Sequence, residues 1–360
     1  MAVISLKCPN CDGELIFDPS TKKYKCEYCT SLFTQEELDA MNQMGTEEEQ
    51  AEETPAKGQQ KETAEQEESV QEAAVYQCPN CGAEIVTDAT TAASFCYYCH
   101  NPVVLGGRLS GEYLPDRIIP FSVTKEAALK GFEGYIGKKK FVPRAFFSKK
   151  QVESMSGVYF PYWMYDTQMK GSMQAEGRNV RVWRTGDTEY TETKHYRVER
   201  EGKIKLENLT ENALQKANYK LAQGMMPYDF SKLEPFQMGY LSGFLAERRD
   251  VEKEQVAPKM KQEMEEDAKR LFRETISGYN SVTVNSSSFQ SQKENWSYVL
   301  LPVWTLTYKA RNGKIYYYSM NGQTGRVYGE LPVDHKKLGL VSAVSALATL
   351  ILALIGGFFL

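Results

Sequence analysis

Residues 8–29 read CPNCDGELIFDPSTKKYKCEYC and residues 78–99 read CPNCGAEIVTDATTAASFCYYC. The two stretches align without a gap at an offset of 70 positions and share the spacing C-x2-C-x14-C-x2-C. Self-similarity of this kind indicates a duplicated module. The two copies contain all 8 cysteines of the 360-residue chain, which are Cys8, Cys11, Cys26, Cys29, Cys78, Cys81, Cys96 and Cys99.

The cysteine spacing predicts two closed metal sites. Each C-x-x-C turn directs two thiolates toward one point, and a short hairpin brings the second pair opposite the first. Four thiolates leave no open position for water, so the expected metal is structural rather than catalytic. We predict two zinc ribbons, over residues 1–38 and 76–107, each folded around one structural Zn²⁺ ion. The ion supplies folding energy that so small a module lacks in its core.

Three other readings of the cysteines were weighed. A redox C-x-x-C usually occurs once and beside a β-α-β pattern, which is not seen here. Disulfides belong to secreted chains, whereas cysteines grouped as metal ligands indicate a reducing compartment. Iron in a rubredoxin-like site uses the same four thiolates, so zinc is favoured on ligand type and spacing but iron is left open.

The charge of the ribbons does not favour nucleic-acid binding. Residues 8–29 carry three lysines against four acidic side chains, and residues 78–99 carry two acidic side chains and no basic one. A phosphate-binding module should present a basic face. We therefore expect the ribbons to contact proteins or to serve only as folded modules.

The C-terminal stretch predicts a membrane anchor. Residues 338–360 read LGLVSAVSALATLILALIGGFFL, without a charge. A helix of this length reaches about 34 Å, enough to cross a hydrocarbon core of ~30 Å. The alternative is a buried core helix. Arg326, His335, Lys336 and Lys337 precede the stretch, so residues 1–337 are expected in the cytoplasm of a single-pass, tail-anchored protein of the cell membrane.

The remaining segments indicate a linker and an α+β domain. Residues 39–75 are rich in Glu, Gln, Ala and Thr, which predicts a flexible acidic linker between the ribbons. Residues 108–337 are predicted to form the α+β domain, with a helix from Thr124 to Gly134 and a strand over 157–166. A later charged helix is expected to hold Pro258 in its first turn. Its predicted apolar stripe is Met260, Met264, Ala268, Leu271, Phe272 and Ile276.

Two Pro-x-Trp segments suggest a second internal repeat. Phe160-Pro161-Tyr162-Trp163 resembles Leu301-Pro302-Val303-Trp304, and each segment follows a helix-like stretch. Arg311-Asn312-Gly313 between two β-rich runs predicts a hairpin, and a second turn is expected over residues 321–325. The domain is therefore predicted to consist of two related lobes, each a helix with an antiparallel sheet.

The sequence contains no recognisable enzyme motif. Residues 131–139 resemble a P-loop only faintly, because Lys139 stands where Ser or Thr must hold magnesium. The three histidines, His100, His195 and His335, have no recognisable nucleophile or carboxylate partner in the sequence. We expect a non-enzymatic protein.

The chain resembles the bacterial TFIIB-type zinc-ribbon membrane proteins, which are often mislabelled as primosomal helicase. The resemblance rests on CPNCG…CYYC, PDRIIPF with TKEAAL, FVPRAF, YFPYW, YLSGFLAERRDVE, LLPVWTLTY and MNGQTGRVYGELP, and it covers most of residues 76–360. Some members of that family are encoded beside a flotillin-like protein and help to recruit phage-shock protein A to the membrane. The resemblance thus implies a membrane-stress adaptor with these two proteins as partners.

Two functions follow as expectations. The first is an adaptor that presents zinc ribbons to cytoplasmic protein partners from the membrane. The alternative is a membrane-tethered nucleic-acid-binding regulator with a basic patch around Lys138, Lys139, Lys140 and Arg144. Small residues four apart in the anchor, such as Gly339 and Ala343, would allow self-association through the helix.

Overall fold

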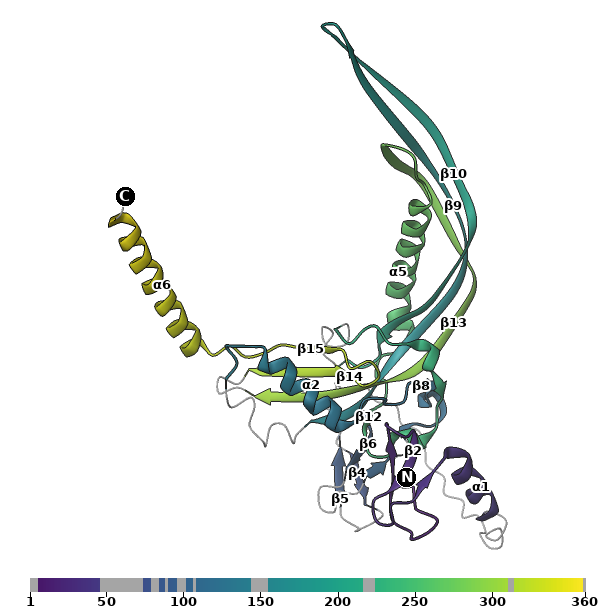
Figure 1. Ribbon diagram of the computed structural model, residues 1–360. Coiled ribbons are helices and arrows are strands. Elements are labelled where there is room, and N and C mark those ends of the chain that lie inside the picture. Colours follow the sequence, from purple (N-terminus) through teal and green to yellow (C-terminus); the bar gives the residue numbers. More distant parts are fainter. Residues whose placement is uncertain are drawn as a thin grey trace, which may run out of the picture.

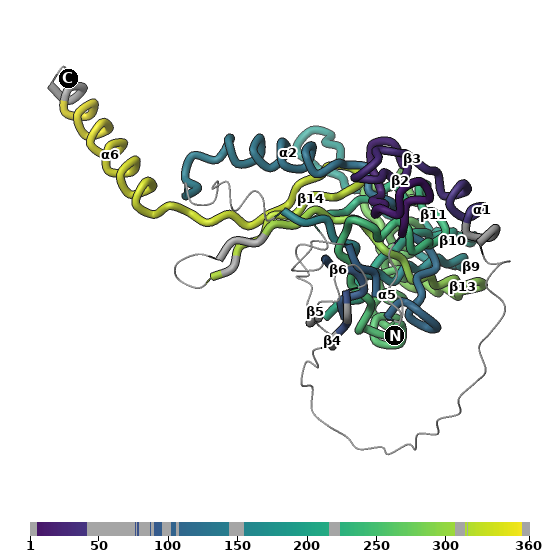
Figure 2. The backbone as a smooth tube through the Cα atoms, turned by 90° about the horizontal axis from the view of Figure 1, so that it is seen from below, coloured from purple at the N-terminus to yellow at the C-terminus, as the bar shows by residue number. Residues whose placement is uncertain are grey.

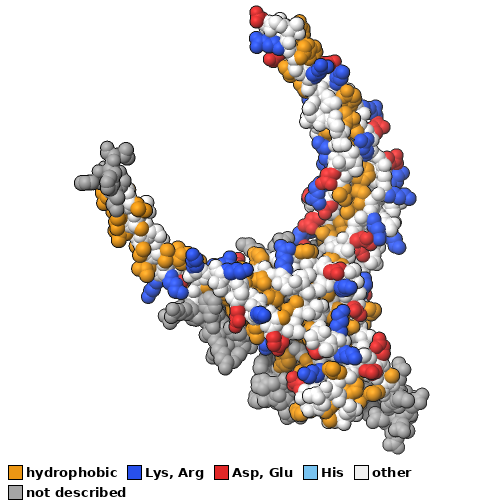
Figure 3. Space-filling model, in the orientation of Figure 1, with side chains coloured by type: hydrophobic (Ala, Val, Ile, Leu, Met, Phe, Trp, Pro, Cys, Tyr) orange, Lys and Arg blue, Asp and Glu red, His pale blue; other side chains and the backbone are white. Residues whose placement is uncertain are grey.

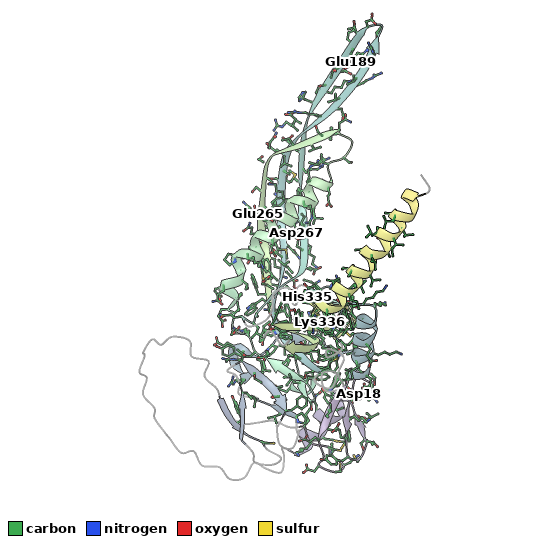
Figure 4. The ribbon with its side chains drawn as sticks, turned by 90° about the vertical axis from the view of Figure 1, so that its left-hand side faces the viewer. Asp18, Glu189, Glu265, Asp267, His335 and Lys336 are labelled. Carbon is green, nitrogen blue, oxygen red and sulfur yellow. The ribbon has the colours of Figure 1, made fainter. Side chains whose placement is uncertain are left out.

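The computed structural model describes residues 6–45, 74–78, 84–87, 90–95, 102–105, 108–143, 155–215, 224–309 and 314–358. It confirms a mixed α+β fold with a cysteine cluster near the N-terminus and one apolar C-terminal helix. A ten-stranded sheet forms the body, from which a long β-arm and the C-terminal helix α6 project to the same side (Figures 1 and 4).

Fifteen strands are described. They are β1 (Leu15–Asp18), β2 (Lys23–Cys26), β3 (Leu32–Phe33), β4 (Ala74–Gln77), β5 (Glu84–Thr87), β6 (Thr91–Phe95), β7 (Pro102–Val104), β8 (Arg117–Ile118), β9 (Ser156–Thr185), β10 (Thr188–Asn212), β11 (Glu234–Pro235), β12 (Leu245–Glu247), β13 (Ser281–Lys309), β14 (Ile315–Asn321) and β15 (Val327–Gly329). The helices are α1 (Gln35–Gly45), α2 (Lys125–Gly137), α5 (Lys253–Glu274) and α6 (His335–Phe358), with 3₁₀ turns η2 (Gly111–Tyr113), η4 (Phe230–Lys232) and η5 (Met238–Leu241).

The predicted short strand over 157–166 is only the first part of β9, which has 30 residues. It pairs on one side with β10 and on the other with β13, and these three strands form the arm. Along the arm one face of β9 is buried under α5, including Met169 and Met173. Beyond Arg178 the β9–β10 hairpin continues alone, and Trp183 stacks on Tyr190 with ring centroids 5.6 Å apart.

Helix α5 differs from its prediction in where it begins and in the residues of its buried stripe. It begins at Lys253, after a capping box between Glu252 and Gln255, so the expectation that Pro258 lies in the first turn is wrong. The buried stripe is Val256, Met260, Met264, Ala268 and Phe272. Leu271 was expected in the stripe but is 40% exposed, because the helix turns it away from the arm.

The two Pro-x-Trp segments lie side by side at the centre of one sheet. Phe160 of β9 pairs with Leu301 of β13, and the strands run antiparallel from that point. Each strand also takes a short parallel neighbour, β12 beside β9 and β8 beside β13. The two Pro-x-Trp segments therefore lie in one sheet, and both Trp side chains belong to one core.

Two hydrogen bonds, one from each Trp side chain, connect the two Pro-x-Trp segments to the helices of the domain. The indole N–H of Trp163 donates to the carbonyl oxygen of Val251, which precedes α5, over 2.9 Å. The indole N–H of Trp304 donates over 2.9 Å to the carbonyl oxygen of Val123, which precedes α2. A Trp of β9 thus holds the chain before α5, and a Trp of β13 holds the chain before α2.

The predicted turns fit the C-terminal strands. β13 and β14 pair from Val303↔Asn321 to Lys309↔Ile315, and residues 310–313 lie outside the described residues. The turn over 321–325 is confirmed: the Asn321 side-chain oxygen accepts from the N–H groups of Gln323 and Thr324, and Gly325 has φ 73°. Helix α2, capped by Thr124, packs Phe132 against Tyr318 of β14, and Figure 2 shows the two elements alongside each other.

Candidate metal centre

Four sulfur atoms of the first ribbon meet at one point. The Sγ atoms of Cys8, Cys11, Cys26 and Cys29 all lie within 4.8 Å of one another. Cys8 Sγ is 3.6 Å from Cys29 Sγ, and Cys11 Sγ is 3.5 Å from Cys26 Sγ. Sulfurs bound tetrahedrally to zinc at about 2.3 Å stand about 3.8 Å apart, so the four atoms fit one such ion. This ligand set was predicted from the sequence, and the structure shows that it could bind one metal ion.

The local backbone explains this convergence. Each C-x-x-C pair is followed by a residue in the left-handed region, Asp12 with φ 57° and Thr30 with φ 60°. The N–H of Asp12 donates to the carbonyl of Cys8, and the N–H of Thr30 donates to that of Cys26, so each pair is closed by a tight turn. Gly13 leaves room at the centre, because an added Cβ would lie 3.2 Å from the sulfurs of both Cys11 and Cys26.

The four thiols have unequal surroundings. Burial raises the pKa of Cys8, whereas the side-chain and backbone hydrogen bonds of Ser31 lower the pKa of Cys29 to about 6. The Ser31 hydroxyl oxygen lies 3.2 Å from the Cys29 sulfur. Cys29 is therefore the thiol best prepared to be a thiolate, the form that binds metal.

The second predicted site lies largely outside the described residues. Cys81, Cys96 and Cys99 are not described, and Cys78 is buried at 2% exposure. The flanking strands are described and repeat the first ribbon at an offset of 70 positions. The bridge Lys7↔Glu14 recurs as Gln77↔Glu84, and the pairs Tyr24↔Phe33 and Lys25↔Leu32 recur as Ser94↔Val103 and Phe95↔Pro102. Three residue pairs are thus repeated, whereas the hairpin β1–β2 has no counterpart among the described residues, because β5 pairs with β4 and β6 belongs to the ten-stranded sheet.

The sequence as a whole has a relative of matching length. It is 31% identical over 362 residues to the Bacillus subtilis (strain 168) uncharacterized protein YdjG, covering 99% of this chain and 100% of that protein. The chain belongs to the YdjG family. No protein-family model matches it, and no solved structure matches it.

In this member of the YdjG family, the first ribbon is packed against the body, an arrangement that the sequence reasoning missed. The N–H of Phe17 donates to the carbonyl of Ser242 over 3.2 Å, and the Ser242 hydroxyl donates back to the carbonyl of Leu15. Leu15 and Phe17 are 1% and 2% exposed, and the Phe17 ring lies 5.3 Å from that of Tyr240. Ribbon 1 is therefore part of the main hydrophobic core, not a module hanging from a tether.

Two glycines of the body make this contact close. An added Cβ on Gly239 would lie 2.4 Å from the Tyr24 hydroxyl, and one on Gly243 would lie 2.3 Å from a methyl group of Ile16. Burial raises the pKa of Tyr24 far above its ordinary value. The glycines of the stretch GYLSGF, residues 239–244, were the available sequence signal, because a backbone that must be closely approached favours glycine. Nothing in the sequence, however, says which segment approaches it.

The expected linker boundary also differs. Helix α1 runs from Gln35 to Gly45 and so crosses the predicted end of the ribbon at residue 38. Thr34 and Glu37 form a capping box, in which the Thr34 hydroxyl accepts from the Glu37 N–H and the Glu37 carboxylate accepts from the Thr34 N–H. Leu38, at 4% exposure, fixes α1 to the ribbon core.

Replacing Gly243 with Ala should release ribbon 1 from the body. The residue has φ +86°, and the new methyl group would collide with Ile16. Hydrogen exchange of the amides of residues 6–45 should rise, while the metal content stays the same. Gly186→Ala is the matched control, since Gly186 has φ +64° but open space around it. Equal protection of the ribbon in both variants would show that this contact does not hold it.

Proposed function

We propose that this protein is a non-enzymatic, tail-anchored membrane adaptor with two structural zinc ions. The observation that carries the proposal is the combination of a four-thiolate cluster, whose ribbon is built into the body, with a long apolar helix whose most apolar window is left unburied by the described residues. A closed metal site fits a structural role, because it has no position for substrate or water. The exposed helix needs an apolar environment, which a bilayer supplies.

The second zinc site is proposed from symmetry of the backbone. Strand pairs on both sides of the C-x-x-C turns recur at the same offset as the cysteines themselves. These recurring pairs and the identical cysteine spacing support the proposal that Cys78, Cys81, Cys96 and Cys99 hold a second ion. Zinc is preferred over iron for both sites on ligand type and spacing.

Helix α6 is the proposed anchor. The stretch His335–Leu354 is long and apolar enough to cross a membrane, and none of its most apolar window is buried. That supports an anchor over the core helix weighed as an alternative. The flanking Lys336 and Lys337 support a cytoplasmic position for the body. Gly339 and Ala343 are exposed on α6, which leaves self-association open to the helix.

The arm sets a condition on how α6 enters the bilayer. It points to the same side of the body as α6 and carries charged side chains, with ion pairs such as Lys170–Glu201 and Arg197–Glu199 (Figures 3 and 4). Charged strands of this kind do not enter hydrocarbon. In the membrane-bound form we therefore expect α6 to take a different direction relative to the arm.

The arm is the proposed docking element for protein partners. At its tip Trp183 and Tyr190 remain 41% and 46% exposed, and Val182 is 55% exposed. Exposed aromatic side chains on a rigid hairpin are typical anchors of protein interfaces. The flotillin-like protein and phage-shock protein A, implied by the family resemblance, are the proposed partners.

The two α+β units are proposed to be related lobes. Their crossed Trp hydrogen bonds and matched parallel strands are the contacts expected if one ancestral unit had paired with a copy of itself. The nucleic-acid alternative has less support. Lys138, Lys139 and Lys140 lie beside the first residues of α6, and Arg144 lies outside the described residues.

Affinity capture from membranes tests the adaptor function. The full-length protein should retain a flotillin-like protein or phage-shock protein A after mild solubilisation. The double change Cys78→Ser and Cys81→Ser should lower that capture about tenfold or more by unfolding the second ribbon, as metal loss does in small zinc modules. Resistance to alkaline extraction should remain the same in both proteins, since α6 is untouched. Undiminished capture by the variant would remove the second ribbon from the proposed interface.

A further inference from the structure

Basic side chains from two distant segments gather where α6 leaves the body. Lys138, Lys139 and Lys140 follow the end of α2, and Lys336 and Lys337 belong to the first turn of α6. Figure 3 shows these basic groups around the lower end of α6, and Figure 4 marks Lys336 at the same place. We call the five lysines the basic collar.

A direct hydrogen bond holds the two halves of the collar together. The N–H of Asp334 donates to the carbonyl of Phe141 over 2.6 Å, so the chain that enters α6 is tied to the chain that leaves α2. The tie is made by Asp334, the residue directly before α6. The collar therefore lies at the entry point of α6.

The charge of the collar is mostly available to a partner. Lys138, Lys139, Lys140 and Lys336 are exposed. The Asp334 carboxylate between the two halves caps α6: it accepts from the N–H groups of Lys336 and Lys337 and lies 4.0 Å from the Lys337 ammonium. Lys139 also lies over the ring of Tyr135, 5.3 Å from its centroid. Among the five lysines, Lys337 has the Asp334 carboxylate beside it, and the exposed side chains of Lys138, Lys140 and Lys336 extend the positive charge around it.

We propose that the basic collar binds the anionic headgroups of phospholipids at the surface where α6 enters the bilayer. The inference rests on the proposed anchoring by α6 and adds a lipid preference to it. Apolar side chains beside the collar support the placement at an interface, since Val333 and Leu338 are 47% and 37% exposed. Lysines next to a membrane helix are drawn to anionic lipid, and the attraction weakens with salt. A nucleic acid would have to reach the same lysines past the bilayer surface, which makes lipid the better occupant.

Site-resolved lysine labelling tests the proposal on the full-length protein. The protein is reconstituted into phosphatidylcholine vesicles with and without phosphatidylglycerol, and lysine acylation is followed by mass spectrometry. Acylation of Lys138, Lys139 and Lys140 should be slowed about fivefold by phosphatidylglycerol at low salt, and high salt should restore it. Lys170 and Lys203 on the arm are the internal control and should react equally in both vesicles. Equal reaction of the collar in both vesicles would overturn the proposal.

Variants separate lipid binding from anchoring. Changing Lys138, Lys139 and Lys140 together to Gln should abolish enrichment of phosphatidylglycerol among co-purified lipids, and changing them to Arg should preserve it. Both variants should remain resistant to alkaline extraction. Undiminished enrichment in the Gln variant overturns the collar alone, whereas extraction of the unaltered protein overturns the anchor and the collar together.

Discussion

Replacing Cys26 with Ser is expected to lower the zinc content from two ions per chain to about one and to unfold the first ribbon. Cys26 is fully buried, and its sulfur lies 3.5 Å from that of Cys11. A serine hydroxyl is a poor substitute for a thiolate ligand, and a ribbon of this size folds only with its metal. Because Leu15 and Phe17 belong to the main core, the loss should extend to the face of the body beneath them.

Metal analysis and hydrogen exchange check this prediction together. Zinc per chain should fall by about half, and the amides of residues 6–45 and of the GYLSGF stretch should lose protection. Lys23→Ala on the exposed side of the same hairpin is the control and should change neither quantity. Two retained zinc ions in the Cys26 variant would contradict the assignment of this cluster. A visible iron–thiolate absorption band in the unaltered protein would show that the site holds iron instead of zinc.

Trp304→Ala is expected to cost about 3–5 kcal/mol of unfolding free energy, the usual range for removing a large buried ring. The side chain is 4% exposed, its ring centroid lies 5.1 Å from that of Phe121, and its N–H holds Val123 before α2. The change would leave a cavity and an unpaired carbonyl at the junction of the two units. Both effects act on the same free energy of unfolding.

Chemical denaturation followed by circular dichroism measures that cost. Trp183→Ala is the matched control, because it removes the same side chain from the exposed arm tip. We expect it to change the unfolding free energy by less than about 1 kcal/mol. Equal costs for the two variants would contradict a central role for the crossed Trp contacts.

Local patterns predicted several elements correctly because their causes are local. Thr124 caps α2 and the turn at residues 321–325 follows β14, as capping and turn residues indicate. The first four cysteines converge because their spacing fixes two tight turns and one hairpin. Pro258 does not mark the first turn of α5. The capping box at Glu252 and the burial of Val256 outweigh the backbone hydrogen bond that Pro258 cannot make.

The sequence pattern does not predict the length of the arm. Along residues 167–185, buried and exposed side chains alternate only where α5 covers one face of the strand. Past Arg178 neither face of the strand is buried by the described residues. A β-strand of 30 residues exists here because β10 and β13 supply partners along it from positions far away in the chain. The alternation of apolar and polar residues reflects burial of one face, and that burial depends on α5, whereas the length of the strand depends on its pairing partners.

The sequence by itself determined the ligand set of the first cluster, the repeat of its spacing and the apolar character of α6, since each depends on neighbouring residues alone. The tertiary structure decided that ribbon 1 is packed on Gly239 and Gly243, that the two Trp side chains contact the chain before α5 and α2, and that the lysines after α2 lie near the start of α6. These contacts join residues 88 or more positions apart. Their free energy comes from mutual burial and from hydrogen bonds formed only when the whole chain is in place.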